Sequence, residues 1–352
     1  MVAALRTLGG LALLVAIPAC GNPTHDDFML ATPKHSPVVD LDRATPWAVV
    51  SGFGSTWLQT IGDASGVTEV RGGKVEPLIR VEGEGAASID VGAGSVWTPF
   101  TTRTQQTGYD LPEGEAHLAR IDPDDKRVTT TIDLGAGSAV DVVANEERVW
   151  VTVEIHDGPG RIVEVDPLVD RVVGEIPLGT GAGPLALRGS TMWAATRGGF
   201  GNGYRLGRGG PAPRRTTGAI EFKAPIGALA ASDDAVWAAS GNVDEDGAIA
   251  KVDPETMTVV SSVDLPGQVG GDLGLDDGSV WVGVWSFDDD HFPRATAMAV
   301  EIDENSGAVR QALTLGDGIT KGISVQGPRV VALTFDSVEE GLPTGRLLVL
   351  VA

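Results

Sequence analysis

Two pairs of histidine and carboxylate residues are the side chains of this sequence best suited to catalysis or metal binding. His156 is followed by Asp157, and Asp289 lies just before His291 in the stretch SFDDDHF. Imidazole and carboxylate ligands suit zinc or manganese, and a carboxylate that orients a histidine makes a general base. Neither stretch has the spacing of a metal site, so several parts of the chain would have to converge. The sequence favours the simpler interpretation, in which both stretches are solvated loops.

A second acidic stretch, NVDEDG, places Asn242, Asp244 and Asp246 at alternate positions before Gly247. This matches the first half of a calcium-binding loop. The twelfth position of such a loop falls on Asp253, but the intervening AIAKV has the composition of a strand, which would carry Asp253 about 20 Å away. The complete loop is therefore excluded, and a partial divalent-cation site completed by backbone oxygens remains open.

One basic island stands out in the acidic chain. The stretch RGGFGNGYRLGRGG combines arginines with many glycines, a composition that holds an anion through guanidinium and backbone N–H groups. It is not a nucleoside-triphosphate loop, because no Gly-Lys-Ser/Thr follows it. The alternative is a flexible loop whose arginines offset nearby acid. Taken with the histidine stretches, the candidates for contacts with a ligand are His156, Asp157, Arg205, Arg208, Asp289 and His291.

The composition favours binding over catalysis. The sequence has no Gly-x-Ser-x-Gly, its only cysteine is Cys20, and its five histidines are a small supply for acid–base work. The formal net charge of −22 argues against nucleic-acid binding, which needs clustered Lys and Arg, and favours cationic or metal partners. Catalysis by carboxylates alone stays open.

A repeated scaffold must position these side chains. Tryptophan closes a short apolar run at intervals of about 44 residues, the length of one four-stranded propeller blade. Val331 takes its place in a seventh copy. Most copies continue into a hairpin of β-branched residues, in three of them around an Asp-Pro turn. The pattern predicts that each tryptophan fills the wedge between two blades. The repeated residues are Trp57, Trp97, Trp150, Trp193, Trp237 and Trp281.

The two ends of the repeat region complement each other. The last unit has three strands, and the segment 36–44, SPVVDLDRA, resembles the missing outer strand. We therefore expect an all-β, seven-bladed β-propeller over residues 38–352, closed by its N-terminal strand, which removes the open edges. Six blades is the alternative, if the degenerate first unit, residues 45–81, is irregular.

The long loops are predicted to gather on one face. Connections from the second to the third strand of a blade share a face with the links between blades, and we call this the long-loop face. Variable loops on a rigid scaffold are where ligands usually bind. The long or irregular segments all fall in this class, at residues 101–117, 154–160, 196–218, 240–247, 286–296 and 336–345.

The N-terminus predicts export and anchoring. Residues 1–19 have one early arginine and a short apolar run, the form of a secretory signal. The run IPAC resembles the lipobox of bacterial lipoproteins, although Pro18 departs from it. The resemblance implies that Cys20 is acylated, for example with palmitate, and anchors the chain to the bacterial cell envelope, outside the cytoplasm. Residues 20–37 are rich in Pro and polar residues, which favours a flexible tether.

The repeated pattern, a Gly-Ser-Val-Trp-like run followed by Ile-Asp-Pro and Ile-x-Leu-Gly, resembles YVTN/NHL-type propellers and the streptogramin-lyase-like proteins among them. The resemblance implies the fold. Lyases of that group use a histidine with nearby carboxylates and a metal, but no stretch of this sequence matches that signature residue by residue. The favoured function is thus a binding or scaffold protein for a protein, peptide or glycan. The alternative is a metal-assisted lyase or hydrolase.

Overall fold

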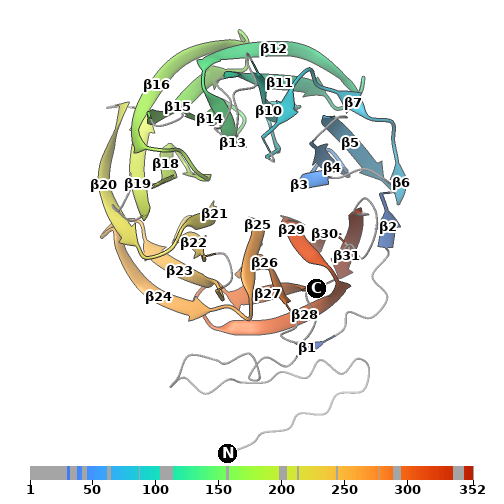
Figure 1. Ribbon diagram of the computed structural model, residues 1–352, viewed down its shortest axis with the longest axis vertical. Helices are drawn as coiled ribbons and strands as arrows, with labels where there is room; N and C mark the ends of the chain where they lie inside the picture. Colours follow the sequence, from blue (N-terminus) through green and yellow to red (C-terminus); the bar gives the residue numbers. More distant parts are fainter. Residues whose placement is uncertain are drawn as a thin grey trace, which may run out of the picture.

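The structure is a computed structural model made of antiparallel β-sheets arranged in a ring (Figure 1). It describes residues 30–31, 38–41, 46–61, 65–86, 88–103, 114–155, 158–197, 204–211, 214–242, 245–276, 278–287, 295–335 and 345–351. The seven sheets confirm the prediction of a seven-bladed propeller, and the first unit forms a blade of its own. Within the described ranges no helix is long and apolar enough to cross a membrane.

Blades 1 to 4 follow one another along the chain, and each begins at the channel and ends at the rim. Blade 1 contains β3 (Pro46–Gly52), β4 (Ser55–Thr60), β5 (Gly66–Arg71), β6 (Lys74–Val75) and β7 (Ile79–Arg80). Blade 2 contains β8 (Glu84–Gly85), β9 (Asp90–Gly92), β10 (Ser95–Arg103), β11 (Gly114–Asp122) and β12 (Arg127–Ala136). Blade 3 contains β13 (Ser138–Ala144), β14 (Val149–Glu154), β15 (Pro159–Asp166) and β16 (Arg171–Thr180). Blade 4 contains β17 (Leu185–Arg188), β18 (Thr191–Arg197), β19 (Tyr204–Pro211) and β20 (Arg214–Phe222).

Blades 5 to 7 complete the ring. Blade 5 contains β21 (Ile226–Ala231), β22 (Val236–Ser240), β23 (Ala248–Asp253) and β24 (Thr258–Asp264). Blade 6 contains β25 (Gln268–Asp276), β26 (Ser279–Phe287), β27 (Ala295–Asp303), β28 (Val309–Asp317) and, at its outer edge, β1 (Leu30–Ala31). Blade 7 contains β29 (Ile319–Gln326), β30 (Arg329–Phe335), β31 (Gly345–Val351) and β2 (Val38–Asp40).

The closure of the ring follows the prediction. The early strand β2 pairs antiparallel with β31, with Val38 opposite Leu348 and Val39 opposite Leu347. The Leu41 N–H extends the ladder by donating to Gly345 O at 3.0 Å. One pairing was not foreseen: Leu30 and Ala31, within the segment expected to be a tether, add a parallel fifth strand to β28.

The core lies between the blades. Seven hydrophobic clusters each join two neighbouring blades, and together they cover all seven interfaces. Trp97 of blade 2, for example, packs with Val149 and Val151 of blade 3. All six repeated tryptophans are buried, and Val331 fills the same place at the interface between blades 7 and 1. The tryptophan period in the sequence is therefore the period of the interfaces.

A second, polar set of contacts links the outer parts of the blades. The residue opposite each tryptophan on the third strand is charged, and three cationic examples donate to a backbone carbonyl in the outer hairpin of the next blade. Two of these side chains also lie over their tryptophan ring. The three hydrogen bonds run from Arg120 to Pro167 O (2.8 Å), from Arg208 to Pro254 O (2.7 Å) and from Lys251 to Glu304 O (2.6 Å).

Candidate functional site

Two cavities lie along the axis of the propeller. The mouth cavity, of about 330 Å³, is lined by the links between blades at residues 182–184 and 225–227, together with Thr196 and Tyr204. These residues belong to the long-loop face, so the cavity opens there. The deep cavity, of about 210 Å³, is lined by residues farther along the inner strands. Asp141 and Asp272 line both cavities and therefore stand where the two adjoin.

Both aspartates hold the same place in the repeat. Asp141 lies nine residues before Trp150, and Asp272 lies nine residues before Trp281. This position lies two residues towards the long-loop face from the residue opposite the tryptophan, and in blades 2, 3, 4 and 6 it lines the cavities. The other blades carry small or cyclic residues there, which are Ala48, Ser88, Pro184, Ala228 and Gly322.

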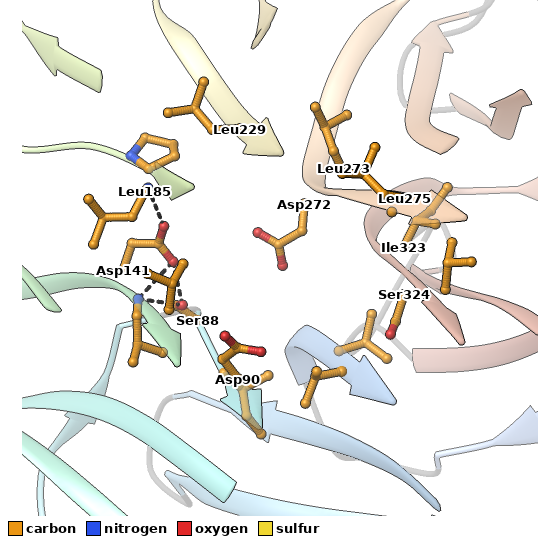
Figure 2. A pocket seen from close by; sticks show the side chains of 18 residues that line it. Ser88, Asp90, Asp141, Leu185, Leu229, Asp272, Leu273, Leu275, Ile323 and Ser324 are labelled. Carbon is orange, nitrogen blue, oxygen red and sulfur yellow. Dashed lines mark hydrogen bonds between the residues drawn. The ribbon is translucent and has the colours of Figure 1, made fainter. Parts of the chain in front are cut away.

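Asp141 is held by hydrogen bonds from three blades. Its carboxylate accepts from the Leu185 N–H of blade 4 (2.6 Å), the Ser88 hydroxyl of blade 2 (2.5 Å) and its own neighbour's Val142 N–H (2.9 Å). Figure 2 shows these bonds on one side of the channel. Burial raises the pKa of Asp141, and the hydrogen bonds from Ser88 and Leu185 oppose this increase. The side chain therefore joins inner strands that share no sheet.

Asp90 has a similar structural role at the position two residues farther from the long-loop face. Its carboxylate accepts from the Ala144 N–H of blade 3 (2.7 Å) and from the Val91 N–H (2.8 Å). At the same repeat position in blade 7, the Ser324 hydroxyl accepts from the Ser51 N–H of blade 1 (2.8 Å). Burial raises the pKa of Asp90 to about 7, while the two backbone hydrogen bonds lower it.

Asp272 differs from both. Among the residues that the structure describes, it has no hydrogen-bond donor, and its carboxylate points into the channel towards the side of Asp90 and Asp141 (Figure 2). Burial is the largest cause that raises the pKa of Asp272 to about 8, and the charges of Asp141 and Asp90 add to it. A carboxylate that is desolvated and unpaired is costly for the fold.

The backbone before Asp272 explains its different direction. Gly271 has a φ of +64°, whereas Val140, at the same position in β13, does not have a positive φ. A Cβ on Gly271 would lie 1.6 Å from Lys321 O, so only glycine fits where β25 approaches β29. The left-handed turn reorients the next residue, and the Asp272 side chain enters the channel rather than bonding to the next blade.

The channel collects negative charge without a neighbouring cation. The residues that line the two cavities include three aspartates and no lysine or arginine. Across the described parts of the chain, no three His, Cys, Asp or Glu side chains are placed to hold one metal ion. The arrangement can therefore attract a positively charged group, and the carboxylate available to contact it is Asp272.

The candidate residues chosen from the sequence either lie away from the two cavities or fall outside the described residues. Those outside are Cys20, His156, Asp157, Asp244, Asp289 and His291. None of the four described candidates lines either cavity. Arg205 pairs with Glu221 (3.2 Å), and Arg208 lies opposite Trp193 and bonds to blade 5. Asn242 donates to Glu245 (2.7 Å), and Asp246 is exposed.

The channel aspartates were missed, although the sequence carries a signal for them. Counting nine residues back from each tryptophan, or from Val331, finds seven equivalent positions, and only two of the seven are charged. The run Gly-Gly-Asp at 270–272 further marks the place where the backbone departs from the other repeats.

Comparison with known proteins supports the fold and leaves the family open. No family model matches the sequence, and no curated protein matches it either. Among solved structures, one similar chain is the hydrazine synthase of Kuenenia stuttgartiensis, with a TM-score of 0.55 and 13% identity. The match covers 74% of this chain and 78% of that one. At this identity the likeness shows the propeller fold alone.

Proposed function

We propose that this protein is a lipid-anchored β-propeller of the bacterial cell envelope that binds a protein, peptide or glycan through its long-loop face. The propeller supplies a rigid ring, and the ligand sits at the mouth of the axial channel. Cys20 carries the lipid, and residues 20–37 connect it to the ring. We also propose that its repeats are of the YVTN/NHL type, which they resemble in sequence.

One observation carries the proposal for the binding face. The larger of the two axial cavities opens between the links at 182–184 and 225–227, on the face to which the sequence assigns the long loops. Concave sites with a few polar groups among apolar walls are the usual form of ligand pockets. In this cavity Tyr204 and Thr196 supply polar groups, and Ala195 and Ile226 supply apolar surface.

The metal-assisted lyase or hydrolase gains no support from these residues. It depends on His156 and His291, which lie outside the described residues. The described residues offer no three-ligand group for a metal. The channel aspartates also lack a neighbouring histidine among the residues that line the two cavities.

The binding face can be tested by blocking the mouth cavity. Thr196→Trp places a large ring in it, and Glu147→Trp adds the same ring to an exposed turn at the opposite end of blade 3. Both variants and the wild type are immobilised and exposed to envelope extract and to peptide and glycan arrays. We expect Thr196→Trp to lose at least 90% of the specific signal and Glu147→Trp to retain it. Equal capture by both variants would place the ligand elsewhere.

Anchoring has a separate test. The Cys20→Ser variant is expected to lose metabolic labelling with a palmitate analogue and to move from the membrane fraction to the soluble fraction of exported protein. Labelling that persists in Cys20→Ser would exclude this residue as the lipid attachment site.

A further inference from the structure

The carboxylate of Asp272 is the polar group in the channel that the fold leaves unused. Asp141 and Asp90 each accept hydrogen bonds from the backbone of a neighbouring blade. Asp272 holds the same repeat position as Asp141, but no described residue donates to it, and it points into the space where the two cavities adjoin (Figure 2). A carboxylate that lines a cavity and has no described donor is suited to a ligand that supplies one.

The ligand group that fits is an organic cation. A calcium ion needs six to eight oxygens at close range, and the described carboxylates form no three-ligand group. Asp141 has also committed both oxygens to the protein. An ammonium or guanidinium group instead needs one carboxylate as a direct partner, and the other two aspartates add attraction at longer range.

The walls of the channel fit the rest of such a ligand. Above Asp272, towards the long-loop face, the mouth cavity is lined by apolar residues such as Ala182, Pro184 and Ile226. Lysine and arginine side chains bury their methylene stems along surfaces of this kind while the charged head meets a polar partner. The mouth cavity above holds more volume, about 330 Å³ against 210 Å³, so it can take the backbone from which the side chain descends.

We propose that the channel binds the side chain of a lysine or arginine residue of a peptide ligand, which enters from the long-loop face and pairs with Asp272. The inference deepens the proposed function and rests on it for the direction of entry. The ligand class is thereby a basic peptide, with Asp272 as the direct contact and Asp141 and Asp90 as the surrounding charges.

The charge state of the site provides a second readout. Burial, with the charges of Asp141 and Asp90, raises the pKa of Asp272 to about 8, so protons compete with the ligand near neutral pH. The groups that face Asp272 from the other inner strands are these two aspartates, and the cavity linings contain no histidine, lysine or arginine. Binding should therefore strengthen as the pH rises from 6.5 to 8.5.

Isothermal titration calorimetry with a hexalysine and a hexaarginine peptide tests the proposal on the full propeller. Asp272→Asn removes the charge in the channel, and Asp276→Asn removes the same charge from the same strand outside the cavity linings. We expect Asp272→Asn to weaken peptide binding at least tenfold and to reduce its pH dependence to the part that comes from Asp90 and Asp141. Asp276→Asn should change the affinity by less than twofold, which separates the channel from the general attraction of an acidic protein.

Titrations with other cations identify the kind of ligand that carries the positive charge. Binding of 1,5-diaminopentane that equals the peptide affinity would assign the site to a free amine and overturn the peptide ligand. Ca²⁺ binding that Asp272→Asn abolishes would overturn the organic cation altogether. Unchanged peptide affinity in Asp272→Asn would also overturn the inference, but a mouth ligand lost in Thr196→Trp would still support the proposed function.

Discussion

The two sides of the channel use the same residue in different ways. On the side of blade 3, Asp141 is surrounded by donors from blades 2, 3 and 4. On the side of blade 6, Asp272 occupies the same repeat position and has no donor among the described residues. The backbone at this point differs between the two strands. In β13 only Val140 bulges and Asp141 stays in the ladder, whereas in β25 Gly271 has a positive φ and Asp272 bulges with it.

The comparison shows how a repeat protein gains a site. Polar residues on the inner strands normally bridge blades, as Asp141, Asp90 and Ser324 do. In β25 a glycine in a left-handed conformation stands in a two-residue bulge that includes Asp272, and the aspartate is removed from that structural role. The fold then tolerates an unpaired carboxylate, a cost that natural proteins usually retain where a function depends on it.

The largest expected effect follows from restoring a side chain at the glycine. In Gly271→Ala the new Cβ would lie 1.6 Å from Lys321 O, in a conformation that L-residues rarely adopt. We expect the free energy of unfolding to fall by about 3 kcal/mol or more. Denaturant titration measures it. Gly227, at the same position in blade 5, has open space around it, and Gly227→Ala should change stability by less than about 1 kcal/mol. Equal losses of stability in the two variants would contradict the conclusion that only glycine fits at position 271.

The next effect separates the two aspartates directly. Asp141→Ala removes the acceptor of two backbone N–H groups and one hydroxyl, so we expect a loss of about 2–3 kcal/mol. Asp272→Ala removes a carboxylate without a described donor and relieves repulsion from Asp141 and Asp90. Its stability should stay within about 1 kcal/mol of wild type or rise. Chemical denaturation of both variants checks this, and a larger loss in Asp272→Ala would contradict it.

The sequence predicted the ring and its closure because both depend on periodic burial. Six tryptophans at intervals of about 44 residues can lie at equivalent places only if the units repeat in space, and an unpaired outer strand needs a partner. The strand register follows from the same alternation, so Val39 could be assigned to the last blade before its contacts with Leu347 were known.

The site could be predicted only in part. The position nine residues before each tryptophan is visible in the repeat, and so is the charge at two of its seven copies. Which of the two aspartates stays available depends on the φ angle of Gly271 and on the distance to Lys321 O. Neither is a property of residue type or spacing.

The pH dependence of stability tests the same contrast. The pKa of Asp272 is raised to about 8 and that of Asp90 to about 7, above the value of about 4 in the unfolded chain. The folded state thus binds more protons, so the contribution is fully present below pH 4 and is lost as the pH rises towards 8. We expect thermal denaturation to show a loss on the order of 2 kcal/mol between pH 7 and 8.5.

Variants divide this pH effect between sites. In Asp272→Asn the slope of stability against pH should fall, since one of the carboxyl groups with a raised pKa is gone, whereas Asp276→Asn should keep the wild-type slope. A stability that increases with pH over this range would have the wrong sign and would exclude a desolvated carboxylate in the channel.

The smallest expected effect concerns the hydroxyl that distinguishes the two sides. Ser88 donates to Asp141 and accepts from the Val142 N–H at 3.1 Å, and the corresponding residue beside Asp272 is Ala228. Ser88→Ala should cost about 1 kcal/mol and leave peptide affinity unchanged, because Asp141 keeps its bond to Leu185. If Asp141 instead swings into the channel as Asp272 does, peptide affinity will rise in Ser88→Ala. That result would show that the hydroxyl, rather than the backbone at Val140, keeps Asp141 out of the channel.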